Sequence, residues 1–382
     1  MKVILGSQKS SGVPEFAGSS WVRLQYVLGL RALGIESYWV DRLPEVKLDK
    51  NPHSLDYLTK RFAAMMKQFG LENNYCVVYN GGEQHFGMSE AELGNLADEA
   101  DLLINISGHL PEDSPLMRVP RRAYVDVDPG FTQIWAHEVD MNFAKHTHFF
   151  TIGQTVGTPE FKIPLQGIDW QVIRPPIFLG EWTPNIDESY KRFSTVADWR
   201  GSQEAIFEGV YHGGKRDEFI KFLRLPPYTG ERFELALCIG QHDYEDLGLL
   251  DGHLWKVQNF AQYTGDVESY REFIQTSRAE FSVAKGGYVR SNSGWVSDRT
   301  ACYLASGKPA LVQSTGFEKQ LPTGEGLVTF TTLDEAVAGV EAINADYLAH
   351  ANAARKIAEE YFDSAKILPS MLEHAGLGAV VS

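Results

Sequence analysis

The residues with the clearest chemistry lie in one glycine-rich segment, residues 277–327. The segment reads as a strand, a polar loop over 286–295, a helix that begins near Val296, and then a strand and a loop. A helix start presents unpaired N–H groups and partial positive charge, and glycines let an anion approach the backbone. Lys285 and Arg290 add two full charges. The pattern predicts a pyrophosphate site, and the lack of a GxxxxGK[ST] motif excludes a P-loop.

A second glycine-containing turn carries a similar pattern. Within 209–223, a predicted strand ends in His-Gly-Gly and a helix begins at Lys215. Gly214 and Lys215 are therefore further candidates for anion binding. A plain turn with a solvated lysine explains the same residues, so both interpretations stay open.

These residues need a scaffold, and the chain as a whole predicts an α/β one. Short apolar runs alternate with longer amphipathic stretches, which is typical of βαβ units and parallel sheets. The expected strands are 2–5, 36–40, 75–79, 102–106, 123–127, 148–151, 205–211, 233–238, 279–283, 309–312 and 326–329. The expected helices are 19–33, 54–69, 89–97, 215–223, 269–276, 297–305, 333–343 and 347–360, with a further amphipathic piece to His374.

Length and composition favour two domains. A chain of 382 residues exceeds the size at which a single core stops growing. Residues 173–185 are rich in Pro, Gly and Trp and indicate the connection between the two halves. We expect an N-terminal Rossmann-like domain (1–177), a linker (178–191), a C-terminal Rossmann-like domain (192–360) and a tail (361–382) that packs toward the first domain.

Within this layout, one motif is specific. The run Ser293-Gly294-Trp295-Val296-Ser297, followed by a helix that ends in Ser306-Gly307-Lys308-Pro309, resembles the donor-binding signature of GT-B glycosyltransferases. It is similar to the nucleotide-sugar box of plant small-molecule glycosyltransferases and to the Gly-Lys-Pro turn of bacterial GT-B enzymes. The resemblance covers the C-terminal half well and the N-terminal half only in general layout.

The resemblance implies an α/β protein of GT-B fold, with two Rossmann-like domains that face each other across a cleft. It implies a metal-independent hexosyltransferase without a cofactor, in which a nucleoside-diphosphate sugar, by family frequency a UDP-sugar, binds the C-terminal domain. A hydroxylated small molecule or glycan would bind the N-terminal domain. The candidate donor-binding residues are Gly214, Lys215, Lys285, Arg290, Ser293, Gly294, Trp295, Ser297, Asp298, Thr323, Gly324 and Glu325.

This sequence departs from the plant pattern at two positions. Asn292 stands where the family has a histidine, and the ribose-binding glutamate falls on Thr300 or Cys302. Asp298 or Glu325 could replace that glutamate. Retaining GT-B enzymes often carry two glutamates eight positions apart in this region, and their absence favours inversion. Trp295 fits a core position as well as it fits contact with a base or sugar.

An inverting transferase needs a general base at a strand end of its acceptor domain. His109 and Asp128 follow two predicted strands and are our candidates. A loop histidine and a helix cap ahead of Pro129 are the alternative roles. Asp126 and Asp128 also match a DxD metal motif, but that three-residue match leaves the second Rossmann-like half unexplained, so we expect no metal.

Composition and charge limit the possible partners and the cellular location of the protein. The net charge of -15 argues against nucleic acid as a partner without excluding it, and it disfavours glycosylation of a DNA base. The three cysteines form no CxxC motif and read as buried thiols. Without a signal peptide or long apolar run, we expect a cytoplasmic protein without a membrane span. A nucleotide-sugar epimerase and a non-catalytic nucleotide or sugar binder are the alternatives on the same scaffold.

Overall fold

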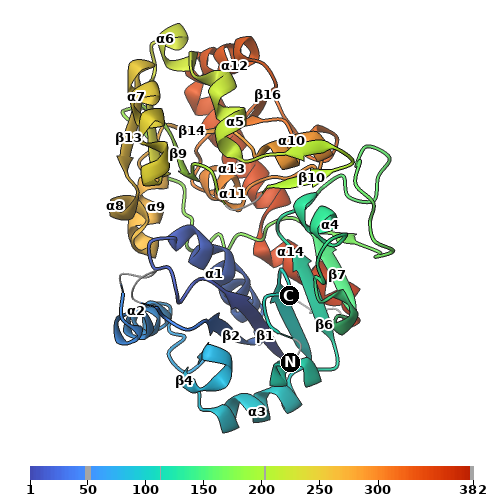
Figure 1. Ribbon diagram of the computed structural model, residues 1–382. Helices are drawn as coiled ribbons and strands as arrows, with labels where there is room; N and C mark the ends of the chain where they lie inside the picture. The colour runs from blue at the N-terminus through green and yellow to red at the C-terminus, as the bar shows by residue number, and fades with distance from the viewer. Residues whose placement is uncertain (48–52, 112, 202–203, 379–382) are drawn as a thin grey trace.

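The structure is a computed structural model that describes residues 1–47, 53–111, 113–201 and 204–378. In these ranges the chain forms two α/β halves, one above the other in Figure 1, each built around its own sheet. The α/β fold class predicted from the sequence is therefore confirmed. No helix in the described ranges is long and apolar enough to cross a membrane.

The N-terminal half contains the larger sheet. Its strands are β1 (Lys2–Gln8), β2 (Glu36–Leu43), β3 (Tyr75–Tyr79), β4 (Gln84–Gly87), β5 (Leu102–Ile106), β6 (Arg122–Asp126), β7 (His148–Thr151) and β8 (Gln171–Val172). They lie in the order β4-β3-β2-β1-β5-β6-β7-β8, and every pair except β3–β4 is parallel. The helices of this half are α1 (Ala17–Ala32), α2 (Leu55–Gln68), α3 (Glu90–Glu99) and α4 (Phe131–Trp135).

The C-terminal half has a six-stranded parallel sheet in the order β13-β12-β9-β14-β15-β16. Its strands are β9 (Arg192–Asp198), β12 (Arg232–Cys238), β13 (Trp255–Asn259), β14 (Ala279–Ser282), β15 (Ala310–Gln313) and β16 (Leu327–Phe330). Numbered within this half, the order is 3-2-1-4-5-6, that of the Rossmann fold. The reversal between β9 and β14 is where such sheets bind ligands, at the carboxyl ends of the strands.

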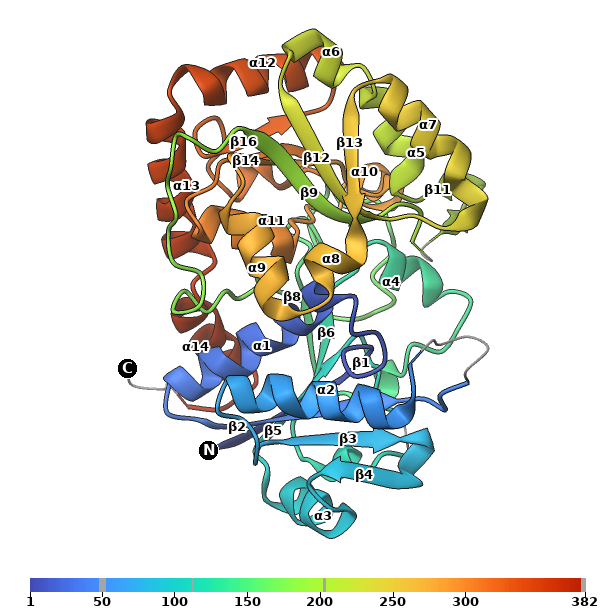
Figure 2. The same cartoon turned by 90° about the vertical axis from the view of Figure 1, so that its left-hand side faces the viewer.

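The helices of the C-terminal half surround this sheet (Figure 2). They are α5 (Lys215–Phe219), α6 (Leu225–Thr229), α7 (Tyr244–Gly252), α8 (Phe260–Thr264), α9 (Val267–Gln275), α10 (Gly286–Ser291), α11 (Asp298–Ala305), α12 (Leu333–Ala345) and α13 (Tyr347–Tyr361). A last helix, α14 (Ser364–His374), follows α13. Capping residues fix where several of these helices begin. Ser297 is the N-cap of α11, and Thr332 and Glu335 form a capping box at the start of α12.

The last helix returns to the N-terminal half. Residue Ile177 bridges to Asp363, and α14 then packs along α1 in both ribbon views (Figures 1 and 2). The approach is close, because a Cβ on Gly29 of α1 would lie 2.6 Å from Leu368. The helical part of the expected tail thus lies on the first half; residues 379–382 fall outside the described ranges.

Most predicted elements of the N-terminal half are confirmed, but the prediction for the start of the C-terminal half was wrong. The first strand there is β9, which the sequence did not reveal because polar Ser194 and Thr195 occupy buried positions. The expected strand 205–211 is instead a hairpin of β10 (Ala205–Phe207) and β11 (Val210–His212), which turns at Glu208 and Gly209 with positive φ. The segment 205–212 is therefore an insertion between β9 and α5.

Candidate functional site

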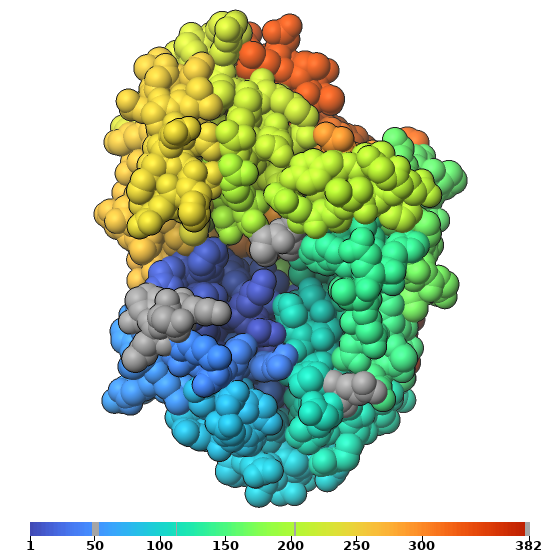
Figure 3. Space-filling view, in the orientation of Figure 1, coloured from blue at the N-terminus to red at the C-terminus, as the bar shows by residue number. Residues whose placement is uncertain are grey.

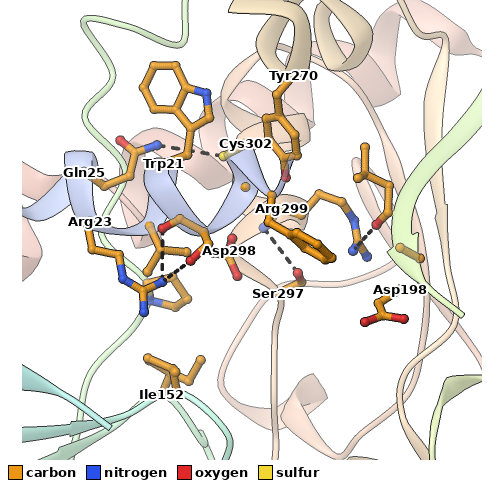
Figure 4. A pocket seen from close by; sticks show the side chains of 18 of the residues that line it. Trp21, Arg23, Gln25, Ile152, Asp198, Tyr270, Ser297, Asp298, Arg299 and Cys302 are labelled. Carbon is orange, nitrogen blue, oxygen red and sulfur yellow. Dashed lines mark hydrogen bonds between the residues drawn. The ribbon is translucent and has the colours of Figure 1, made fainter. Parts of the chain in front are cut away.

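A cavity of about 340 Å³ lies between the two halves. One wall comes from α1, where Trp21, Arg23 and Gln25 face the space, and the opposite wall comes from the start of α11 (Figure 4). The carboxyl end of β9 and the start of α5 complete the C-terminal side. The cavity thus reaches the switch point of the C-terminal sheet, where the fold predicts a ligand.

Two lysines, buried Lys215 and partly buried Lys285, contribute positive charge to this cavity. Lys215 donates a hydrogen bond to the carbonyl oxygen of Val283, and no carboxylate in the described residues pairs with it. Burial lowers the pKa of Lys215 well below its usual value, and the charges of Arg299 and Lys285 lower it further. Burial also lowers the pKa of Lys285. An anion between the two ammonium groups would restore their charged forms, so this arrangement favours an anionic ligand.

Arg299 lies beside these lysines, but its guanidinium is already paired with the carboxylate of Glu280. Its guanidinium donates to Glu280 at 2.7 Å, to the carbonyl oxygen of Val196 at 2.7 Å and to Ser282 at 2.6 Å. The buried carboxylate raises the pKa of Arg299 against the opposing effect of burial. Arg299 therefore supports the cavity wall, and the two lysines remain the candidates for ligand binding.

The N-terminal half contributes a carboxylate that reaches across to the C-terminal half. Asp128 lies 3.7 Å from the ammonium nitrogen of Lys285 and accepts a hydrogen bond from the Tyr288 hydroxyl. Tyr288 stacks in turn on Trp295, with ring centroids 4.3 Å apart. Trp295 packs on Tyr288 and also lines the cavity, so its position is compatible with both roles that the sequence left open.

Asp126 does not share this exposure to the cavity. Its carboxylate accepts hydrogen bonds from Thr132, Gln133 and Thr151 and from the backbone N–H of Asp128. These bonds fix the loop after β6 and aim only Asp128 at the cavity. The two aspartates are therefore not arranged as a DxD pair, and the described residues contain no group of three or more metal-binding side chains.

His109 lies after β5 and does not line this cavity. Its Nδ1 is buried and has no hydrogen-bond partner in the described structure. Burial, and then the charges of Arg23, Lys9 and Arg42, lowers the pKa of His109 to about 3. The imidazole is therefore neutral at physiological pH, and its neighbourhood is cationic.

The expected glycine-loop site for pyrophosphate differs in the structure. Residues 286–291 form helix α10, with Lys285 at its N-cap. The N–H groups of Gly286 and Gly287 donate to the carbonyl oxygens of Gly214 and Gly213 at 3.3 and 3.2 Å. These glycines allow two backbone segments to meet, so the amides that the sequence assigned to an anion already have partners.

Several candidates lie away from the cavity. Arg290 is exposed because α10 carries it to solvent. Ser293 and Gly294 pack on the N-terminal half, where their carbonyl oxygens accept from the N–H groups of Thr155 and Gln154. Thr323, Gly324 and Glu325 form an exposed loop. Gly214 supports α10 as described above, and only Asp128, Lys215, Lys285, Trp295, Ser297 and Asp298 of the predicted set line the cavity.

The structure distinguishes between the two positions, Thr300 and Cys302, on which the ribose-binding glutamate of the plant enzymes falls. Cys302 lines the cavity and accepts a weak hydrogen bond from Gln25 at 3.9 Å, whereas Thr300 does not line it. Of the two suggested replacements, Asp298 faces the cavity and Glu325 does not. Burial raises the pKa of Asp298. Asp298 is therefore the one of the two suggested replacements that a ligand in this cavity could contact.

Sequence reasoning missed Arg23, Gln25, Tyr288 and Arg299. Arg23 lies on α1, donates to the backbone oxygen and hydroxyl of Ser19 at 3.0 and 2.9 Å, and has a buried Nε without a partner in the described residues. A charged residue inside a strongly apolar helix is a usable signal, because such residues are rarely buried without a purpose. Nothing in the sequence indicated which C-terminal segment Arg23 would face.

Known proteins agree with this geometry. Residues 234–368 match the family model described as glycosyl transferase-like. An α-glucosyltransferase in complex with UDP-glucose and DNA containing an abasic site has a similar structure, with a TM-score of 0.60 at 10% identity, over 98% of this chain and 99% of that one. HepE from Anabaena, in complex with UDP, gives 0.56 at 13% identity over 98% and 100%. Sucrose-phosphate synthase from Thermosynechococcus elongatus gives 0.55 at 9% identity over 97% of each chain. No curated protein matches the sequence.

The fold is therefore GT-B, that of nucleotide-sugar glycosyltransferases, as the sequence motif predicted. The matched segment runs from β12 to α14 and includes Lys285 and the start of α11. The C-terminal half thus carries a glycosyl transferase-like domain, within a chain that has the GT-B fold.

Proposed function

We propose that the protein transfers a sugar from a UDP-sugar to a hydroxylated acceptor, with inversion and without a metal or cofactor. The observation that carries the proposal is buried Lys215, beside partly buried Lys285, in the interdomain cavity of a protein with net charge -15. A buried ammonium group that pairs with no carboxylate of the described residues, as in Lys215, is costly unless a ligand supplies the negative charge. A diphosphate supplies it, and two of the similar structures hold UDP.

The proposed donor lies with its diphosphate between Lys215 and Lys285. Asp298 accepts hydrogen bonds from its hydroxyl groups, and the Trp295 ring offers an apolar face. When the bond from the anomeric carbon to the diphosphate breaks, the two lysines stabilise the charge that develops on the departing UDP. The lysines thereby take the part that a divalent ion plays in metal-dependent transferases.

Asp128 is the proposed general base. It reaches the cavity from the N-terminal half, where an acceptor would bind. Its carboxylate takes the proton of the acceptor hydroxyl while that oxygen attacks the anomeric carbon opposite the leaving diphosphate. Lys285 would exchange Asp128 for the donor phosphate, which frees the carboxylate for this step. His109 remains the second candidate, as a neutral imidazole outside the cavity.

The first test is thermal stability with UDP, GDP, dTDP and CMP, with and without a chelator. A ligand that binds only the native state raises the melting temperature by mass action. We expect a shift with UDP that the chelator leaves unchanged, that Lys215→Met removes and that Arg290→Ala, a matched cation outside the cavity, preserves. No shift with any nucleotide would disprove the proposal.

The second test is turnover of UDP-sugars with hydroxylated acceptors, followed by NMR of the product. Transfer with an inverted anomeric centre supports the role of Asp128, and a retained centre would overturn it. Conversion of the UDP-sugar to an isomeric UDP-sugar without an acceptor would identify an epimerase instead.

A further inference from the structure

A second hollow lies on the acceptor side of the molecule. It has a volume of about 290 Å³ and is lined by the ends of β1 and β2 and the residues that follow them, including Lys9, Arg42 and Lys47. Figure 3 shows the face of the molecule on which the blue N-terminal segment lies below the yellow-green part of the C-terminal half. Three cations thus line one hollow of a strongly acidic protein.

Its position in the sheet is that of a ligand site. Strand β1 lies between β2 and β5, so the chain order reverses beside it. Gln8, the last residue of β1, is in register with Arg42 on β2, and Lys9 follows immediately. His109 follows the neighbouring strand β5. The carboxyl ends of three adjacent strands therefore present these side chains at one edge of the sheet.

The backbone that carries Lys9 is held in a strained conformation. Its φ is +90°, a region that residues with a side chain rarely adopt because of steric clashes with the backbone. The buried carboxylate of Asp41 fixes the loop on both sides of Lys9: it accepts from the Ser7 hydroxyl at 2.6 Å, the Ser11 hydroxyl at 2.6 Å and the Ser11 N–H at 2.8 Å. Such strain persists where the surroundings fix it, and it is concentrated at binding sites.

Among the described residues, two of the three cations have no counter-ion. Lys47 lies 3.2 Å from Glu45, but within the described ranges the side chains of Lys9 and Arg42 form no hydrogen bond or ion pair. Their charge reaches the site: both lower the pKa of His109, and Lys9 also opposes the charge of Lys285. Lys9 is therefore close to the acceptor side and to the donor lysine at once.

We infer that the acceptor carries a phosphate group, which Lys9 and Arg42 bind in this hollow. The inference rests on the proposed function, because it names the acceptor class of the same reaction. Two cations on adjacent strands without a counter-ion match the double charge of a phosphate monoester better than the single charge of a carboxylate. The acceptor hydroxyl would then point toward Asp128, whose charge, like those of Lys9 and Arg42, acts on His109.

The test is the dissociation constant of inorganic phosphate for UDP-saturated protein, in which UDP already occupies the donor lysines. We expect Lys9→Gln and Arg42→Gln each to weaken phosphate binding at least tenfold, the effect of losing one charge-assisted contact. The exposed, paired cations Lys60 and Arg118 provide matched controls. Lys60→Gln and Arg118→Gln should leave phosphate binding within twofold. An unchanged melting temperature and UDP affinity would show that each variant is folded.

Each other outcome is decisive. Equal phosphate binding by wild type, Lys9→Gln and Arg42→Gln, or no binding to wild type, would overturn the inference. Acetate binding as tight as phosphate would assign a carboxylated acceptor instead. A short DNA duplex that binds more than tenfold tighter than phosphate, and loses this in both variants, would assign the hollow to nucleic acid. If UDP itself does not bind, the proposed function fails; phosphate titration of the Lys215→Met protein, with and without Lys9→Gln, then tests the anion site alone.

Discussion

Asp128 and Lys285 face each other across the cleft, with a carboxylate oxygen 3.7 Å from the ammonium nitrogen. One belongs to the loop after β6 and the other caps α10, so this ion pair joins the two halves at the cavity. Each residue has a proposed role that requires it to leave the other: the lysine for phosphate, the aspartate for the acceptor proton. The pair thereby couples donor binding to formation of the base.

Substitution of either partner separates the two roles. Asp128→Asn should keep or raise UDP affinity, because it removes a negative charge near the diphosphate, yet lower the transfer rate by about 10²–10⁴-fold. Lys285→Met should lower UDP affinity by roughly 10–100-fold. Calorimetry with UDP and initial rates with the best donor measure both. Reduced UDP affinity in Asp128→Asn would contradict the exchange of partners.

Lys215→Met should stabilise the free protein and remove its response to UDP. Lys215 is 7% exposed, and burial works against its charged form. Because the folded-state pKa is lowered, the charge opposes folding at neutral pH, and methionine removes that cost. Thermal melts with and without UDP measure both effects. A melting temperature below that of wild type without UDP would show that the ammonium group contributes structurally.

Gly287→Ala tests the contact between the halves. A Cβ at this position would lie 2.1 Å from the Phe131 ring of α4, so one side must shift. We expect a loss of about 1–3 kcal/mol in the free energy of unfolding, as for overpacked cores. The control is Gly248→Ala in α7, where a Cβ meets nothing within 4 Å and a gain of roughly 0.5–1 kcal/mol is expected. Denaturant unfolding compares them, and equal stability of the two variants would exclude the close contact.

Lys308 gives a pH-dependent prediction. It donates to the carbonyl oxygen of Asn185 in the connecting segment, and burial lowers its pKa from 10.5 to about 7. Between these values the unfolded chain holds a proton that the folded protein has released, so stability contributed by this group rises with pH. The slope is below the limit of about 1.4 kcal/mol per pH unit. Denaturant unfolding from pH 7 to 10 should show a shallower rise for Lys308→Met; identical slopes would contradict the assignment.

The sequence predicted the local elements well where pattern and position agree. Strands 75–79, 102–106 and 148–151 coincide with β3, β5 and β7, because their apolar runs are buried in a parallel sheet. The start of α11 follows from its Ser297 cap. The central strand β9 was missed because Ser194 is buried through hydrogen bonds to Ser277 and Tyr303, and no apolar run marks it.

The candidate site was predictable only in part. The sequence identified Lys215, Lys285, Asp128 and Asp298 by residue type and position at strand and helix ends, but it also selected Arg290, which lies in solvent. A helical turn of 286–291 separates Lys285 from Arg290, and a polar loop in sequence looks the same whether or not it folds into that turn.

The sequence by itself determined the α/β class, the GT-B motif and the presence of basic residues near helix starts, because these depend on local periodicity and on residue type. Only the tertiary structure decided which groups share the cavity. Arg23 comes from α1 and Lys285 from beyond β14, and the closure of two halves brings them to one space. Burial, which displaces the pKa values of both lysines, and the pairing of the Gly286 and Gly287 amides with the carbonyls of Gly214 and Gly213 arise from contacts between segments far apart in the chain.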